Sequence, residues 1–290
     1  AKAGNGTEVL FAQGCRLTIN TTQSYFNWKY DEIKFASREE NLKLIKEAVK
    51  VASGADIVIL ALGENANLCR EARANNHLGD NMTLDLFGEQ NELADAITAI
   101  GKPVVLYLTN GRPLAVNALA EKVPAIIEGW YMGQETGTAA ADIIFGEVNP
   151  SGKLTITFPK SAGQLPLYYN HKPSAQWQDY LSQDVKPLFH FGHGLSYTEF
   201  SYGRPALKKA TVKKGETARV TVEVKNAGRL AGDEIVQLYI RDVVSTVTRP
   251  VKELKGFARI SLKPGETKKV SFDITPDKLA FHNVEMKYVV

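Results

Sequence analysis

Two continuous apolar runs, at residues 56–62 and 103–108, constrain the fold of this chain more than any other feature. Strands that are apolar on both faces are typical of a parallel sheet covered by helices. A helical pattern precedes each run: a capping box at Ser37 and Glu40 opens the first helix, and Gly101 closes the second. Alternating helices and strands predict an open, mostly parallel α/β/α sandwich.

Two further elements continue this pattern, a third strand at 125–127 and a short helix at 138–145. Ligands of open α/β sheets bind beyond the carboxyl ends of the strands. The polar loop that begins at Gly63 directly follows the first apolar run. We therefore expect this loop to lie at the ligand-binding edge of the sheet.

From about residue 205 the apolar period changes to two. Short alternating strands are predicted at 220–224, 235–240, 251–260 and 270–274, with a turn at 263–266. This spacing predicts an antiparallel β-sandwich of the immunoglobulin or fibronectin type III kind. The predicted domains are residues 1–160, the α/β/α sandwich, and residues 205–290, the fibronectin type III-like domain.

The segment that connects them, residues 161–204, is rich in aromatic side chains. It holds nine of the 26 in the chain, too many for a free polar linker. We expect it to pack on a domain or on a partner. Its histidines, His171, His190 and His193, have no metal-site spacing, so we expect packing or hydrogen-bonding roles for them.

Charge and motifs exclude several classes of protein. The chain has 35 Lys+Arg and 32 Asp+Glu, a net charge of +3, and no concentrated basic stripe, so we expect neither nucleic acid nor membrane as a partner. We expect no metal and no cofactor: there is no dinucleotide fingerprint, and the glycines around 146–152 have the wrong spacing for a phosphate loop. Cys15 and Cys69 either form a disulfide or, as we favour, stay unpaired.

The beginning of the chain suggests a piece of a larger protein. It starts at Ala1, without an initiator Met or a signal-type segment, and the pattern at 7–11 predicts a strand almost at once. A natural N-terminus usually carries a tail or a cap.

Two glutamates in the loop at 63–77 are candidates for chemistry. Glu64 and Glu71 are seven residues apart, and Arg70 and Arg73 flank the second. The residues alone leave two interpretations open. Either the loop is merely solvated, or one glutamate is a general acid/base tuned by burial and neighbouring charge.

A series of ordered motifs resembles the C-terminal part of glycoside hydrolase family 3. The motifs are Gly111–Pro113, Trp130–Gly137, Asp142–Gly146, Asn149–Leu154, Phe158–Pro159 and Pro187–Thr198. Two more, Val236–Ile240 and Arg249–Phe257, resemble the fibronectin-like domain that the family appends.

The resemblance implies three parts: a catalytic (β/α)8 barrel, an α/β/α sandwich and the fibronectin-like domain. Only the last two are expected here, and the sandwich is N-terminally incomplete. It implies a retaining, exo-acting β-glycosidase, β-glucosidase-like, whose nucleophilic Asp lies on the absent barrel. The partners implied are a β-linked oligosaccharide or glycoside and that barrel. The chain alone is expected to be inactive, and family habit suggests a periplasmic or secreted protein.

The resemblance also implies roles for residues of the loop. Glu71 matches the acid/base, and Glu64 matches a recurring glutamate that is structural or substrate-proximal. Arg70, Asn76 and His77 are further candidates for substrate binding. Trp130 and Tyr131 either stack on sugars or, as we favour, pack in the core. An alternative function is a non-catalytic carbohydrate-binding or adhesion module that uses the segment 161–204.

Overall fold

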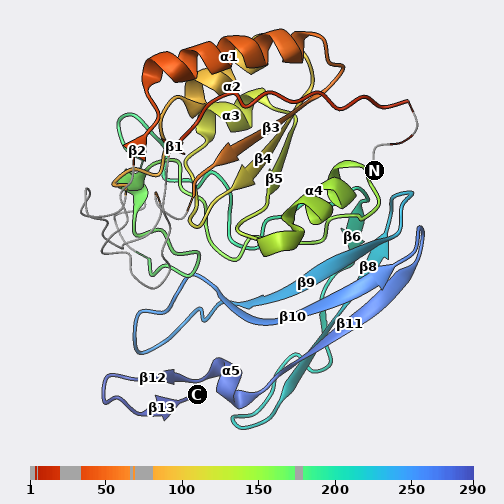
Figure 1. The fold of residues 1–290 in the computed structure, drawn as a ribbon. Coiled ribbons are helices and arrows are strands. Elements are labelled where there is room, and N and C mark those ends of the chain that lie inside the picture. Colours follow the sequence, from red (N-terminus) through yellow and green to blue (C-terminus); the bar gives the residue numbers. More distant parts are fainter. Residues whose placement is uncertain (1–3, 5, 20–33, 66–67, 69–80, 174–178) are drawn as a thin grey trace. The chain divides into compact units, whose positions relative to one another are not determined.

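The computed structural model describes residues 4, 6–19, 34–65, 68, 81–173 and 179–290 (Figure 1). The chain forms two compact units, each with a core of its own. The first contains Ala1–Phe145 and Phe158–Leu165, and the second contains Gly146–Thr157 and Pro166–Val290. The chain therefore passes from one unit to the other three times.

A parallel sheet forms the centre of the first unit. Its strands, in spatial order, are β3 (Val58–Gly63), β4 (Val104–Thr109) and β5 (Ala125–Glu128). β4 is buried as predicted, with Leu106 and Leu108 at most 1% exposed. β3 departs from the prediction, since Leu60 and Leu62 are buried but Ile59 on the opposite face is 41% exposed. The reason is position: within the described residues β3 is an edge strand.

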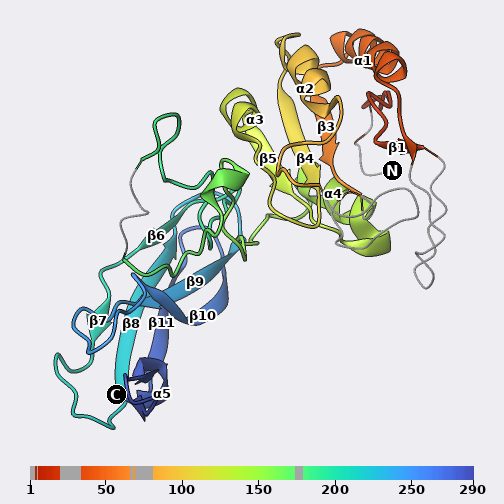
Figure 2. The same cartoon turned by 90° about the vertical axis from the view of Figure 1, so that its left-hand side faces the viewer.

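Helices lie on both sides of this sheet. α1 (Arg38–Ser53), α2 (Gln90–Thr98) and α3 (Asn117–Lys122) lie on one side, and α4 (Thr136–Ile144) lies on the other (Figures 1 and 2). The capping box is confirmed, because the Ser37 side chain accepts a hydrogen bond from the backbone N–H of Glu40. Helical spacing then buries one face of α1, at Asn41, Ile45, Ala48 and Ala52.

Short elements complete the first unit. They are the antiparallel pair β1 (Thr18–Ile19) and β2 (Lys34–Phe35) and two turns of 3-10 helix at Gly133–Glu135 and Ala162–Gln164. The strand predicted at 7–11 is wrong. No residue of the described part pairs with it, and Val9 and Phe11 are 75% and 86% exposed. A short run of apolar and β-branched residues does not form a strand without a neighbouring strand to bond.

Two antiparallel sheets form the second unit, as predicted. One consists of β6 (Phe200–Tyr202), β7 (Ala206–Leu207), β8 (Ala218–Asn226) and β11 (Thr267–Ile274), and the other of β9 (Gly232–Ile240) and β10 (Glu253–Leu262). Val224 and Val270 from the first sheet pack with Val236 and Leu262 from the second. The chain ends with α5 (Pro276–Leu279) and the pair β12 (Phe281–His282) and β13 (Tyr288–Val289).

The aromatic-rich segment packs within the second unit. The Tyr169 ring stacks on Phe191, with centroids 4.1 Å apart, and meets Tyr239 of β9 edge-on at 6.0 Å. Its hydroxyl accepts a hydrogen bond from the backbone N–H of Leu254 in β10. The His193 ring stacks on Phe189, and burial lowers the pKa of this histidine. These contacts fit the expectation that the segment lies on a domain.

A stretch that precedes this segment in the chain also joins the second unit. The backbone N–H of Leu154 bonds to the carbonyl of His193, and that of Gly192 bonds to the carbonyl of Leu154, both at 2.7 Å. At Gly194 a Cβ would lie 2.1 Å from the carbonyl oxygen of Gly152, so only glycine fits there. Residues 146–157 are therefore integral to the second unit.

No helix within the described ranges is both long enough and apolar enough to cross a bilayer.

Candidate functional site

Glu64 is placed by the close approach of two strand ends. Gly63, the last residue of β3, has φ +143°, and a Cβ there would lie 1.9 Å from the carbonyl oxygen of Thr109. Only glycine permits this approach. The backbone N–H of Glu64 then bonds to the same oxygen at 2.8 Å. Glu64 is thus fixed at the carboxyl edge of the sheet, where the sequence predicted a ligand site.

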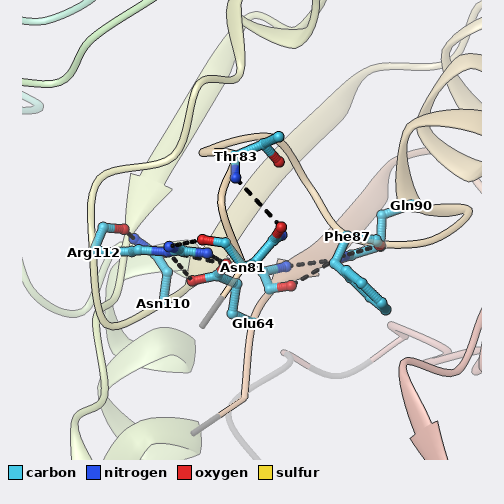
Figure 3. Close-up of polar contacts among 8 residues, drawn as sticks. Glu64, Asn81, Thr83, Phe87, Gln90, Asn110 and Arg112 are labelled. Carbon is cyan, nitrogen blue, oxygen red and sulfur yellow. Dashed lines mark hydrogen bonds and ion pairs between the residues drawn. The ribbon is translucent and has the colours of Figure 1, made fainter. Parts of the chain in front are cut away.

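The Glu64 carboxylate is completely buried and is paired with Arg112 (Figure 3). The Arg112 Nη2 lies 2.8 Å from Oε1, and its Nε lies 3.2 Å from Oε2. The two-point contact satisfies a carboxylate that would be costly to bury alone. Of the two roles left open for Glu64, structural or substrate-proximal, this geometry supports the structural one.

Arg112 also contacts Asn81, the residue that follows the segment 65–80 in the sequence. Its Nη1 donates to the backbone carbonyl of Asn81 at 2.9 Å (Figure 3). The Asn81 side-chain oxygen in turn accepts a hydrogen bond from the backbone N–H of Thr83, at an N···O distance of 3.4 Å. One guanidinium therefore contacts Glu64 before the segment 65–80 and Asn81 after it.

Gln90, at the start of α2, supports the end of β3 from its open edge. Its side-chain amide donates to the Gly63 carbonyl and accepts from the Gly63 N–H, both at 2.8 Å. It also donates to the carbonyl of Phe87 at 3.0 Å. Gln90 is only 2% exposed and pairs with β3 much as a neighbouring strand would.

Asn110 connects the end of β4 to the end of β5. Its Nδ2 donates to the Arg112 carbonyl at 2.9 Å and to the Glu128 carboxyl at 3.3 Å. Burial raises the pKa of Glu128 to about 7, although its hydrogen bonds from the Trp130 N–H and from Asn110 oppose the rise. Within the described residues, the Asn110 Oδ1 and the Tyr107 hydroxyl are buried without a hydrogen-bond partner.

A hollow of about 420 Å³ lies beside Asn65, whose Nδ2 donates to the Thr18 hydroxyl at 3.0 Å. Cys15 also lines it as a free thiol, and burial with the nearby Glu89 charge raises the pKa of this thiol to about 11. A thiol with such a pKa stays protonated and is a poor nucleophile. Cys69, the other cysteine, lies outside the described residues.

The described residues contain one of the predicted site residues. Glu64 is described, whereas Glu71, Arg70, Asn76 and His77 lie outside the described ranges. The sequence alone indicated no role for Arg112, Asn110, Gln90 or Glu128. A signal for Arg112 existed, because the Gly111–Pro113 motif follows β4 and the ends of neighbouring parallel strands meet at one edge.

The two aromatic candidates after β5 differ from one another. The Trp130 ring packs against the buried Phe158, with centroids 5.7 Å apart, as favoured from the sequence. Tyr131 is 46% exposed, so the expectation of core packing is wrong for it. Trp130 has a φ of +50°, in the left-handed region that non-glycine residues rarely adopt.

Residues 3–197 match the glycosyl hydrolase family 3 C-terminal domain. The chain belongs to glycosyl hydrolase family 3. Residues 234–290 match the fibronectin type III-like domain. The family 3 assignment and the combination of an α/β domain with antiparallel sheets agree with the expectation from the sequence.

Two bacterial relatives match this chain over almost its whole length. A β-xylosidase from Formosa agariphila is 48% identical over 293 residues, which cover 100% of this chain and 37% of that protein. A periplasmic β-glucosidase from Salmonella typhimurium is 40% identical over 295 residues, which cover 98% of this chain and 38% of that protein. The chain thus spans somewhat more than a third of these relatives.

Solved structures agree. A β-glucosidase from Erythrobacter marinus has a TM-score of 0.91 and 42% identity, over 98% of this chain and 38% of that one. A β-glucosidase from Listeria innocua, solved in complex with glucose, has a TM-score of 0.77 and 37% identity, over 85% of this chain and 35% of its own.

Proposed function

We propose that the chain is the C-terminal part of a retaining, exo-acting β-glycosidase and that Glu71 is its acid/base. The relatives are named β-glucosidases and β-xylosidases, which supports a β-linked glycoside as the substrate. The observation that carries the proposal is the anchoring of Glu64 and Asn81 by Arg112. It puts both ends of the segment that contains Glu71 at the carboxyl edge of the sheet, where ligands of α/β proteins bind.

Glu64 is the other candidate for the acid, and its surroundings favour Glu71. Its carboxylate has an exposed fraction of 0%, and both oxygens accept from Arg112. An acid/base must reach the glycosidic oxygen and must exchange its proton. A carboxylate held by a guanidinium in the interior meets neither need. Glu64 therefore serves as the support, and we propose Arg70, Asn76 and His77 as the polar groups around the sugar.

The chemistry explains why two parts of a protein are needed. The leaving alcohol must be protonated while a second carboxylate captures the oxocarbenium-like centre, and the two carboxyls of a retaining enzyme lie about 5–5.5 Å apart. We propose that the second carboxylate is an Asp of a (β/α)8 barrel beyond the residues of this chain. The chain alone is then inactive, because it holds only one of the pair.

The remaining expectations complete the proposal. The first unit, residues 1–145 and 158–165, presents the acid/base, and the second unit contains the fibronectin type III-like domain at 205–290. The periplasmic β-glucosidase among the relatives supports a periplasmic or secreted location.

The alternative function is a carbohydrate-binding module that uses the segment 161–204. In that segment Tyr168 and Tyr180 have exposed side chains, at 65% and 53%. The Tyr169 and Phe191 faces are occupied by each other.

The test joins the chain to a family 3 barrel, for which the Formosa agariphila β-xylosidase is a suitable donor. The joined protein is expected to hydrolyse aryl β-xylosides or β-glucosides, and the chain alone is not. Glu71→Gln is expected to lower kcat/KM on a methyl glycoside at least 100-fold, because a poor leaving group needs protonation. The loss on a 2,4-dinitrophenyl glycoside is expected to be much smaller.

Glu8→Gln is the matched control, since Glu8 lies far from the loop in sequence and is exposed. Unchanged hydrolysis of the methyl glycoside by the Glu71→Gln protein would refute the assignment. Binding of oligosaccharides by the chain alone, with no activity after joining, would favour the carbohydrate-binding alternative.

A further inference from the structure

We propose that Arg112 is a positioning residue for the acid/base, an inference that rests on the proposed function. Arg112 contacts the Glu64 carboxylate and the Asn81 carbonyl. In the sequence these two residues flank the sixteen residues that include Glu71. A single side chain therefore joins the two ends of the acid/base segment without belonging to it.

The contacts require an arginine. Nε and Nη2 face the two carboxylate oxygens, while Nη1 faces the Asn81 carbonyl, so the planar guanidinium is used on two of its sides. A lysine ammonium has its donors on one atom and lacks this fork. The Arg112 side chain is only 18% exposed, which shields the pair from water and strengthens it.

The backbone around Arg112 is itself fixed. The Asn110 side chain, which is fully buried, donates to the Arg112 carbonyl at 2.9 Å. A little further on, the Ala115 N–H bonds to the carbonyl of Leu84 at 2.8 Å. The stretch after Arg112 is thereby tied to the stretch after Asn81. The guanidinium thus extends from a rigid turn and can hold the loop ends in one arrangement.

Joining the ends of a loop reduces the conformations that are open to the residues between them. For a general acid this matters, because a displacement of about 1 Å can cost about 100-fold in rate. Loss of Arg112 should therefore act on protonation of the leaving group, through Glu71. It should have little effect on steps that do not need an acid.

The experiment compares leaving groups in the barrel-joined protein. Arg112→Met is expected to lower kcat/KM on the methyl glycoside about 10–100-fold, and on the 2,4-dinitrophenyl glycoside less than about 3-fold. Arg112→Lys should fall between this variant and the parent. If Arg112 served only overall folding, its loss would lower kcat/KM on both substrates by the same factor, because it would only reduce the fraction of active protein. Equal losses would overturn the proposal.

Two further variants keep the test decisive. Arg38→Met is the matched control, since Arg38 also pairs with glutamates, Glu89 and Glu92, at the surface of the same unit. Arg38→Met should leave kcat/KM unchanged on both substrates. Arg112→Met/Glu64→Gln removes the buried charge that Arg112→Met leaves unpaired, so it is measured if the single variant does not fold. The same unequal loss is expected from it, and an equal loss overturns the proposal.

The Glu71→Gln result separates this proposal from the proposed function. If Glu71→Gln does not discriminate between the two leaving groups, the proposed function fails. If Glu71→Gln discriminates and Arg112→Met does not, only the positioning role fails. Hydrogen exchange on the chain alone gives a readout without catalysis: peptides from 65–80 should exchange faster in Arg112→Met than in Arg38→Met. Equal exchange in the two variants counts against the positioning role.

Discussion

Among single residues, Glu128 is the buried group with the clearest consequence for pH. Burial raises its pKa from 4.5 to about 7, so the folded state holds the proton more tightly than the unfolded state does. The protonated Glu128 carboxyl therefore adds to the free energy of unfolding in full below pH 4.5, and this contribution is lost as the pH rises to about 7. The loss is of the order of 3 kcal/mol.

Glu128→Gln should remove this dependence. The amide oxygen can still accept the Trp130 N–H, but the side chain no longer ionises. We expect the variant to be more stable than the parent at pH 8 and about equal to it at pH 4.5. Urea unfolding at several pH values measures this. A slope between pH 4.5 and 7 as steep as the parent's would show that the carboxyl titrates normally.

The Glu64–Arg112 pair shows how far sequence reasoning can go at this scale. The sequence predicted the strand, the Gly–Glu step after it and a ligand-binding edge. It did not predict that Glu64 is wholly buried, because the guanidinium that pairs with the buried carboxylate belongs to Arg112, which is 48 residues away in the sequence. The sequence shows Glu64 and Arg112 after two different strands. That the two form an ion pair could be predicted only with the knowledge that these strands are neighbours in the sheet.

At the scale of elements, the local signals located α1, α2, α4 and the strand β4, but they did not predict α3. The capping box at Ser37 and the apolar run of β4 are confirmed, since each depends on neighbouring residues only. The strand predicted at 7–11 and full burial of β3 failed for a common reason. Both depend on what lies alongside, which periodicity does not encode.

The open edge of β3 leads to a prediction about Gln90. Gln90→Leu removes the hydrogen bonds to Gly63 and leaves a buried N–H and a buried carbonyl without their partner. We expect a loss of about 3 kcal/mol in the free energy of unfolding. Gln13→Leu is the control, because Gln13 is exposed and its side-chain oxygen accepts a hydrogen bond from Arg16 at the surface. Urea unfolding measures both, and similar losses would mean that Gln90 does not stabilise β3.

At the scale of the whole chain, the two units have separate cores and should unfold as separate transitions. Leu106 is fully buried in the first unit and Val236 nearly so in the second. Leu106→Ala should lower the midpoint of one calorimetric transition and Val236→Ala that of the other, each by about 5–10 °C. A single transition that both variants shift equally would show that the units unfold together.

Residues 146–157 limit how the fibronectin type III-like part can be moved between proteins. They precede Phe158–Leu165 of the first unit in the chain, yet their backbone bonds to Gly192 and His193 of the second. A gene fusion that starts after residue 165 would leave that hydrogen-bonding edge bare. A transfer of the second unit that keeps these hydrogen bonds would therefore have to carry residues 146–157 as well as the residues after 165.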